Sequence, residues 1–203
     1  MRRLDHLTLR YMLSRASVMV DEWRHPSHPW LTRDSVNLLS QLLRKEDQGI
    51  EFGSGRSTAW FLSKVSRLLS VESDGAWYSK VTQKNSAAIQ TGRLDYRLAK
   101  TLEEYTSILS RLRENSLDFA LVDGKFRDLC AFEVLPKLKP GALLIVDNIN
   151  LYIPCDASFS PDSRRSMDGP KTPLWGNFLE RTRHFRYVWT SNCVSDTAIW
   201  IKV

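Results

Sequence analysis

Short runs of apolar residues alternate along the chain with longer segments whose apolar side chains recur at helical spacing. Nearly continuous apolar runs are typical of strands buried on both faces, which occur in parallel sheets covered by helices. The runs predict five strands, at residues 50–52, 67–71, 93–99, 117–122 and 141–146. The helical segments predict helices at residues 4–22, 58–65, 76–88, 102–112 and 129–138, and a further helix N-capped by Thr32.

The pattern changes after Asn150. Residues 152–173 form a long segment with four prolines and several serines, which we expect to be a functional loop or disordered. A short helix at residues 174–182 follows, and then come two strands at 185–190 and 197–203, joined by about six residues. That spacing predicts a hairpin, so the sheet should end antiparallel.

Helices that connect parallel strands by right-handed crossovers cover both faces of a sheet. The predicted fold class is therefore α/β: a doubly wound, mostly parallel seven-stranded sheet with helices on both faces and a C-terminal antiparallel hairpin. We expect a single domain, in which residues 1–47 form an N-terminal helical or lid segment and residues 48–203 form the main body.

Composition fits this picture, because 203 residues with 42% hydrophobic and 26% charged residues suit one soluble globular domain. The net charge of +6 permits an anionic substrate or nucleic acid, but the basic residues are mostly interleaved with acids, so a solvated surface explains them as well. Three cysteines without close spacing indicate neither disulfides nor zinc and favour a reducing, cytoplasmic setting. No apolar run is long enough to span a membrane, and Asp5, His6 and Arg10 interrupt the basic start, which argues against a secretory signal.

Polar residues and glycines follow four of the predicted strands. In an open α/β sheet the ligand lies beyond the carboxyl ends of the strands, so these residues should face one crevice. They are Gly53-Ser54-Gly55 after the first strand, Glu72 after the second, Asp123-Gly124 after the fourth and Asp147-Asn148 after the fifth.

The turn at Gly53–Gly55 opens a helix, and glycines there let the backbone bend sharply and approach a ligand closely. Glu72, at the tip of the second strand, is placed to accept both hydroxyls of a ribose, although a solvated strand end is the alternative. A dinucleotide site is less well supported, because Thr58 stands where the fingerprint has its third glycine or alanine. No P-loop or zinc-ligand motif is present.

Four motifs together resemble the class I S-adenosylmethionine-dependent methyltransferases. They are Glu51-Phe-Gly-Ser-Gly55, the acid Glu72, the segment Asp118–Gly124, and Leu138-Lys-Pro-Gly-Ala-Leu-Leu-Ile-Val-Asp-Asn148. The terminal hairpin is also typical of that superfamily, and the resemblance covers most of residues 48–203, which would be its cofactor-binding, Rossmann-like domain. One departure is that the third glycine of many members is Ser57 here.

The resemblance implies that Glu51 and the glycine turn hold the methionine part of S-adenosylmethionine. Glu72 would bind the ribose, Asp123 would face the sulfonium, and the region of Ala99 would hold the adenine. The residues expected to bind the cofactor are Glu51, Gly53, Ser54, Gly55, Ser57, Glu72, Ser73, Ala99 and Asp123.

The chain is similar, within that superfamily, to small-molecule O-methyltransferases of the catechol and caffeoyl-CoA kind. In those enzymes an Asp after the fourth strand and an Asp-Asn pair after the fifth bind a divalent cation, which implies Asp123, Asp147 and Asn148 as ligands of Mg²⁺. Asp123 and Lys125 are the expected catalytic residues. The match is incomplete, because the basic lysine of those enzymes aligns with Phe126, flanked by Lys125 and Arg127.

The expected reaction is methyl transfer to an oxygen of a small molecule, enclosed by the N-terminal segment with Trp23 and Trp30 and by the 152–175 loop with Trp175; plain packing is the alternative for these aromatics. A homodimer is one option for assembly. Two other functions stay open: a nucleic-acid (RNA) methyltransferase and a non-catalytic protein that acts through interaction. Asp-Gly-Lys-Phe126 after the fourth strand argues against methylation of a base nitrogen, which uses an Asn/Asp-Pro-Pro-aromatic motif.

Overall fold

The computed structural model describes residues 6–203, and the helix expected from residue 4 begins, within that range, at Leu9. Its strands are β1 (Gln48–Phe52), β2 (Arg67–Glu72), β3 (Leu94–Leu98), β4 (Leu117–Val122), β5 (Leu138–Asp147), β6 (Arg186–Ser191) and β7 (Asp196–Ile201). Its α-helices are α1 (Leu9–Arg24), α2 (Arg33–Leu42), α3 (Arg56–Lys64), α4 (Gly75–Lys84), α5 (Ser86–Gln90), α6 (Leu102–Ser110), α7 (Arg127–Glu133) and α8 (Pro173–Thr182). Short 3₁₀ turns are η2 (Leu135–Lys137), η3 (Ile149–Leu151) and η4 (Ser166–Asp168).

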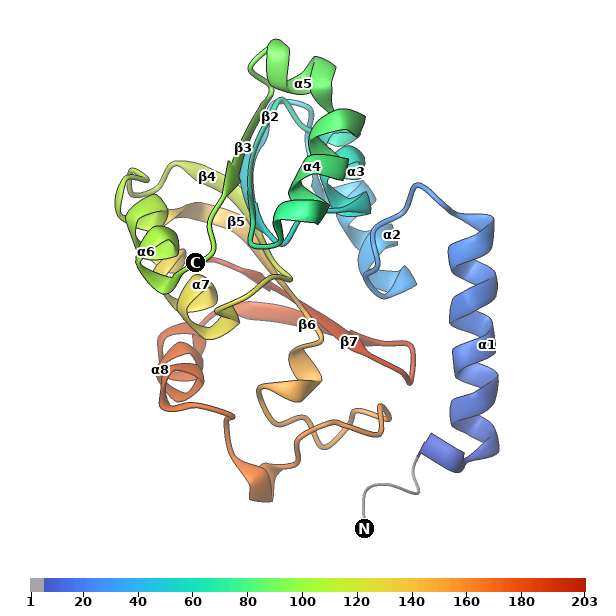
Figure 1. The fold of residues 1–203 in the computed structure, drawn as a ribbon. Coiled ribbons are helices and arrows are strands. Elements are labelled where there is room, and N and C mark those ends of the chain that lie inside the picture. The colour runs from blue at the N-terminus through green and yellow to red at the C-terminus, as the bar shows by residue number, and fades with distance from the viewer. Residues whose placement is uncertain (1–5) are drawn as a thin grey trace.

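The strands form one seven-stranded sheet in the order β3-β2-β1-β4-β5-β7-β6. The first five strands pair in parallel, and β7 pairs antiparallel with both β5 and β6 (Figure 1). This confirms the predicted fold class, including the terminal hairpin. The strand order reverses between β1 and β4, which puts the switch point beside the glycine turn.

Successive residues of β4 point to opposite faces of the sheet, as strand geometry requires. Phe119 and Leu121 enter the hydrophobic cluster beneath α2, α3 and α4, whereas Ala120 and Val122 enter the cluster beneath α6, α7 and α8. The two clusters explain why the central strands are apolar on both faces. They also fix the register that brings the strand ends together at one edge.

Two predicted helices are shorter than expected. The helix predicted at 76–88 breaks at Asn85 into α4 and α5, because the Asn85 side-chain amide donates to the carbonyl of Val81 and ends the first helix. The helix predicted at 129–138 begins earlier, at Arg127, and continues after Glu133 as the 3₁₀ turn η2, which contains Pro136. Proline cannot donate the backbone hydrogen bond that an α-helix would need there.

Helix α1 stands at the outside of the molecule and contains no buried residue (Figure 1). Thr8 caps it by accepting a hydrogen bond from the Tyr11 amide. Its large apolar side chains are exposed, with Leu13 at 63% and Met19 at 61%. The N-terminal part of the chain therefore differs from the sheet, whose strands supply most of the core.

Candidate functional site at the carboxyl edge

The glycine turn after β1 is set by contact with the end of β4. Gly53 has φ +95°, and a Cβ there would lie 2.8 Å from the backbone carbon of Asp123. Its amide donates to the carbonyl of Val71, and the amide of Asp123 donates to the carbonyl of Phe52. A side chain at Gly53 would separate these strand ends, so this glycine brings the predicted residues of β1, β2 and β4 to one place.

Glu51 is fully buried at the foot of the turn. Its Oε1 accepts hydrogen bonds from the hydroxyls of Thr58 and Ser70, the latter at 2.7 Å, and Thr58 in turn accepts from the amide of Gly55. The other oxygen, Oε2, is buried without a hydrogen-bond partner. Burial raises the pKa of Glu51 to about 7, and the two hydroxyls oppose that rise.

Glu72 lies at the tip of β2, as predicted, and is 7% exposed. Its carboxylate accepts four short hydrogen bonds: from the Ser54 amide (3.0 Å), the Ser54 hydroxyl (2.7 Å), the Ser73 amide (2.6 Å) and the Asp74 amide (2.8 Å). The Ser54 hydroxyl also contacts the hydroxyl of Tyr96 at 2.6 Å. Ser54 is therefore the side chain that covers Glu72.

Arg127 joins the ends of β4 and β5. Its Nη2 donates to the carboxylate of Asp123 at 2.8 Å and to the Asp123 carbonyl at 2.9 Å. Its Nη1 donates to the carbonyl of Asp147 at 2.5 Å and to the side-chain oxygen of Asn148 at 3.2 Å, and its Nε donates to the carbonyl of Gly124. One planar guanidinium thus binds every segment that the sequence assigned to a metal ion.

The two aspartates differ in their surroundings. Asp147 is buried, and its carboxylate accepts from the Thr197 hydroxyl at 2.6 Å. Burial and the nearby Asp123 raise the pKa of Asp147 to about 8. Burial also raises the pKa of Asp123, against the opposing charge of Arg127. Asn148 follows in a left-handed conformation (φ 49°), which turns its side chain back toward Arg127.

The predicted Mg²⁺ site does not fit these residues. The oxygens of Asp123 and Asn148 that would coordinate Mg²⁺ accept from Arg127 instead, and the Asp147 carboxylate faces Thr197. A guanidinium already supplies the positive charge that a cation would bring to this edge.

The other predicted residues lie close to the turn with different exposure. Ser57 is buried in the first turn of α3, and Ala99 is buried just after β3, where its amide donates to the Glu72 carbonyl at 2.7 Å. Lys125, the expected catalytic base, is exposed between β4 and α7. The predicted enclosing aromatic residues differ in burial. Trp175 packs against Phe178 in the core, so packing is its role, whereas Trp23 is 81% exposed.

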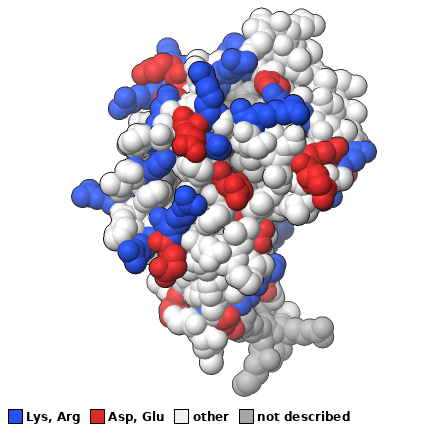
Figure 2. Space-filling view, turned by 90° about the vertical axis from the view of Figure 1, so that its left-hand side faces the viewer, with Lys and Arg blue, Asp and Glu red and all other residues white. Residues whose placement is uncertain are grey.

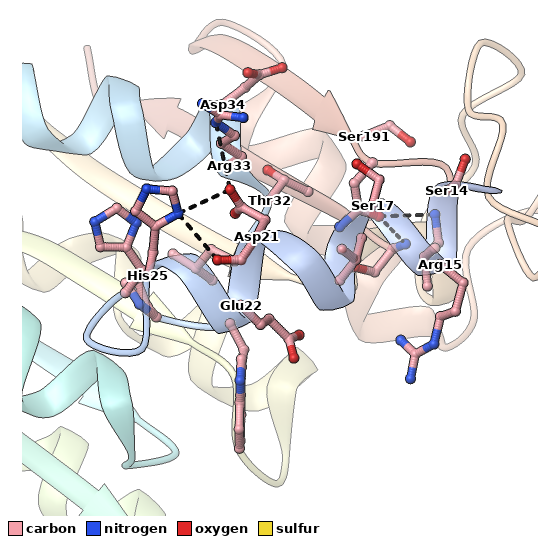
Figure 3. A pocket seen from close by; sticks show the side chains of 18 of the residues that line it. Ser14, Arg15, Ser17, Asp21, Glu22, His25, Thr32, Arg33, Asp34 and Ser191 are labelled. Atoms are coloured by element: carbon pink, nitrogen blue, oxygen red, sulfur yellow. Dashed lines mark hydrogen bonds and ion pairs between the residues drawn. The ribbon is translucent and has the colours of Figure 1, made fainter. Parts of the chain in front are cut away.

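A cavity of about 340 Å³ lies beside this edge, between α1, the start of α2, the first residue of α3 and the β6–β7 loop. Figure 3 shows Asp21 of α1 within it, between His25 and Arg33. Asp21 contacts the His25 ring at 3.1 Å and the Arg33 guanidinium at 3.8 Å. Trp30, which is 52% exposed, also lines this cavity.

Three residues of this edge were not assigned from the sequence. Arg127 was noted only as a neighbour of the missing lysine, and neither Tyr96 nor Arg56 was singled out. An arginine four residues after a strand-end aspartate could have signalled the first, because the two oppositely charged side chains lie close together along the chain. Tyr96 and Arg56 carry no such signal, since their roles depend on contacts made across the fold.

This architecture defines a doubly wound α/β protein. In such folds ligands bind at the carboxyl edge of the sheet, by the switch point of strand order. Residues 50–149 match the family model described as a methyltransferase domain. Over these residues the match confirms the resemblance to class I S-adenosylmethionine-dependent methyltransferases. No curated protein matches the chain in sequence.

Solved structures share this fold at low sequence identity. TomG, an O-methyltransferase from Streptomyces achromogenes involved in tomaymycin synthesis and solved with S-adenosylmethionine, is 18% identical with a TM-score of 0.61 and covers 94% of this chain and 90% of its own. A candidate caffeoyl-CoA O-methyltransferase from Staphylococcus aureus is 17% identical with a TM-score of 0.60, covering 98% and 95%. A candidate rRNA methylase from Clostridium thermocellum is 13% identical with a TM-score of 0.57, covering 84% and 96%.

Across the described residues, the helices are too short or too polar to span a membrane. The same fold occurs in an O-methyltransferase involved in tomaymycin synthesis and in a candidate rRNA methylase, so the fold leaves the acceptor open. The acceptor must therefore be argued from the side chains of this chain.

Proposed function

We propose that this protein transfers a methyl group from S-adenosylmethionine to an oxygen of a small molecule. The observation that carries the proposal is the convergence of the glycine turn, Glu51, Glu72 and Asp123 at one strand edge within a methyltransferase domain. Methyl transfer asks little more of a protein than holding the acceptor in line with the methyl group, so such an edge suffices without a specialised catalytic side chain.

The side chains at the β1–β2 end suit the cofactor. The buried, unpartnered Oε2 of Glu51 offers an acceptor for the amino group of the methionine part. Glu72 would bind the ribose, whose hydroxyls would compete with the Ser54 hydroxyl for the carboxylate oxygens. When bound, S-adenosylmethionine supplies a methyl group on a positively charged sulfur, which becomes a neutral thioether as the methyl group leaves.

The acceptor hydroxyl must lose a proton as its oxygen takes the methyl group. Lys125 is exposed at the β4–α7 junction and is the base we propose for this step. Asp123 would lie beside the reacting atoms. Because Arg127 holds its carboxylate, Asp123 would act through its negative charge on the sulfonium rather than as a metal ligand. The proposed reaction therefore requires no Mg²⁺.

Calorimetry with S-adenosylmethionine tests the proposal. We expect micromolar binding by the wild type and a loss of about tenfold to a hundredfold in Glu72→Gln, because the amide cannot accept both ribose hydroxyls as a carboxylate does. Glu46→Gln is the matched control, since Glu46 is exposed before β1, at the opposite edge of the sheet. No binding by the wild type would rule out the methyltransferase function and favour a non-catalytic protein that acts through interaction.

An RNA acceptor is the second candidate, favoured by the net charge of +6 and by the likeness in fold to a candidate rRNA methylase. On the face that carries α6 and α8, however, acidic side chains lie among the basic ones (Figure 2). A filter-binding assay with structured RNA decides: binding that falls steeply with salt supports the RNA acceptor, and none at low salt eliminates it. Assembly of this protein into a homodimer, which the sequence analysis gave as one option, stays a prediction.

A further inference from the structure

Arg56 is the first residue of α3 and follows the glycine turn directly. Its Nη1 atom is buried and has no hydrogen-bond partner. The guanidinium carbon lies 5.0 Å from the centroid of the Trp30 ring. Among the described residues, no hydrogen bond or ion pair joins Arg56 to a carboxylate or a carbonyl.

A buried guanidinium nitrogen without a hydrogen-bond partner is unfavourable, because arginine stays charged at all accessible pH values and the buried N–H groups lose their water. Proteins usually satisfy such a group with an internal carboxylate. Arg127, on the far side of the glycine turn, is satisfied in this way by Asp123. This difference indicates that the Arg56 guanidinium is available to an anionic ligand that is not part of this chain.

The cavity that Arg56 lines contains acids, but they do not neutralise it. Asp21 is engaged by His25 and Arg33, as Figure 3 shows. Glu22 and Asp34 are exposed, so water screens their charges. Of the charged side chains that line the cavity, Arg56 is the one with a buried and unpartnered polar atom.

The cavity also lies where an acceptor should approach. Strand β7 runs antiparallel to β5 with Thr197 opposite Asp147, so the β6–β7 loop that lines the cavity lies at the carboxyl edge of the sheet. Arg56 reaches the cavity from the residue after Gly55, in the proposed cofactor turn. Its volume of about 340 Å³ is at the small end of the range for small-molecule sites.

We propose that this cavity is the acceptor site and that Arg56 selects acceptors carrying a carboxylate or a phosphate group. The planar guanidinium can bind either anion through two parallel hydrogen bonds. The exposed Trp30 ring beside it provides a flat surface for an apolar or aromatic part of the same molecule. The proposal rests on the methyltransferase function and names the substrate class for that site.

Binding of three probes, measured by calorimetry in the presence of S-adenosylhomocysteine, tests it. Benzoate carries a carboxylate, phenyl phosphate a phosphate, and benzyl alcohol neither. We expect at least one anion to bind more tightly than benzyl alcohol, and Arg56→Met to weaken that anion about tenfold or more. Which anion binds better distinguishes a carboxylate acceptor from a phosphate acceptor.

Arg113→Met is the control, because Arg113 is an exposed arginine that lies before β4, outside the cavity. It should leave the affinity for the anion within about twofold, and Arg56→Lys should retain part of the affinity. Melting temperatures show whether each variant is folded. The proposal is wrong if no anion binds the wild type, if Arg56→Met binds it equally well, or if benzyl alcohol binds as tightly.

These outcomes are separate from those of the proposed function. A protein that binds S-adenosylmethionine but not the anions remains a methyltransferase with a different acceptor. A protein that binds neither loses both proposals, and the calorimetry with the cofactor alone shows which case holds.

Discussion

The two halves of the carboxyl edge hold their acids by different means. At the β1–β2 half, Glu51 and Glu72 accept hydrogen bonds only from hydroxyl and amide groups. At the β4–β5 half, the Asp123 carboxylate and the Asp147 carbonyl accept from the guanidinium of Arg127. Neutral donors leave a negative charge available to a ligand, whereas an internal cation cancels it.

This difference assigns the halves to different tasks. The β1–β2 half can still bind a ligand that brings hydroxyl groups or positive charge, as the proposed cofactor does. At the β4–β5 half, Arg127 already supplies the positive charge that a metal ion would bring, and it joins the ends of the two strands. Resemblance of sequence motifs alone would treat the acids of both halves as ligands.

Removing the guanidinium should have the largest effect. Arg127→Leu leaves the Asp123 carboxylate without its cation and the Asp147 carbonyl without its donor. We expect a loss of about 2–4 kcal/mol in the free energy of unfolding. Ser54→Ala, which removes one neutral donor from Glu72, should cost only about 1 kcal/mol. Urea denaturation measures both.

Arg127→Lys serves as the control, because a lysine keeps the charge but cannot contact Asp123, Asp147 and Asn148 together. It should recover only part of the lost stability. Equal losses in Arg127→Leu and Ser54→Ala would contradict the distinction between the halves.

The pH range over which the free energy of unfolding changes should differ between the β1–β2 half and the β4–β5 half of the edge. The pKa of Asp147 is raised to about 8 and that of Glu51 to about 7, so the native state holds protons that the unfolded chain releases above about pH 4. Each group therefore favours folding at low pH, and its contribution is lost as pH rises through the folded pKa. Asp147→Asn should flatten the profile up to about pH 8, and Glu51→Gln up to about pH 7.

Denaturation midpoints at several pH values between 4 and 9 check this, with a slope of at most ~1.4 kcal/mol per pH unit assigned to each group. Thr197 can still donate to the amide oxygen in Asp147→Asn, so this variant loses the titrating proton and keeps the hydrogen bond. Profiles parallel to the wild type in both variants would show that the two acids are ionised in the folded protein.

The smallest effect should come from metal ions. Neither EDTA nor millimolar Mg²⁺ should change the melting temperature or the turnover of the wild type, because Arg127 holds the oxygens that would bind the ion. In Arg127→Ala those oxygens become available, so Mg²⁺ should stabilise this variant more than the wild type. Loss of wild-type activity in EDTA would restore the metal site that the sequence suggested.

Much of the fold could be predicted because it depends on local patterns. Phe119 to Val122 are apolar without interruption, which indicates a strand covered on both faces, and both clusters confirm it. The glycine turn and Glu72 were predicted at the right strand ends. The break at Asn85 was missed, since a side chain that ends a helix competes only weakly with the helical spacing on either side.

The sequence by itself determined the sheet, its antiparallel end and the set of polar residues at one edge, because strand and helix periods follow from burial along the chain. The tertiary structure decided which partner each polar residue meets. Asp123 could have faced a metal ion or an arginine, and only the packing of α7 on β4 places Arg127 there. Arg56 likewise has a buried nitrogen without a hydrogen-bond partner. Its place in the cavity depends on α1, α2 and the β6–β7 loop meeting beside α3, which no local sequence pattern encodes.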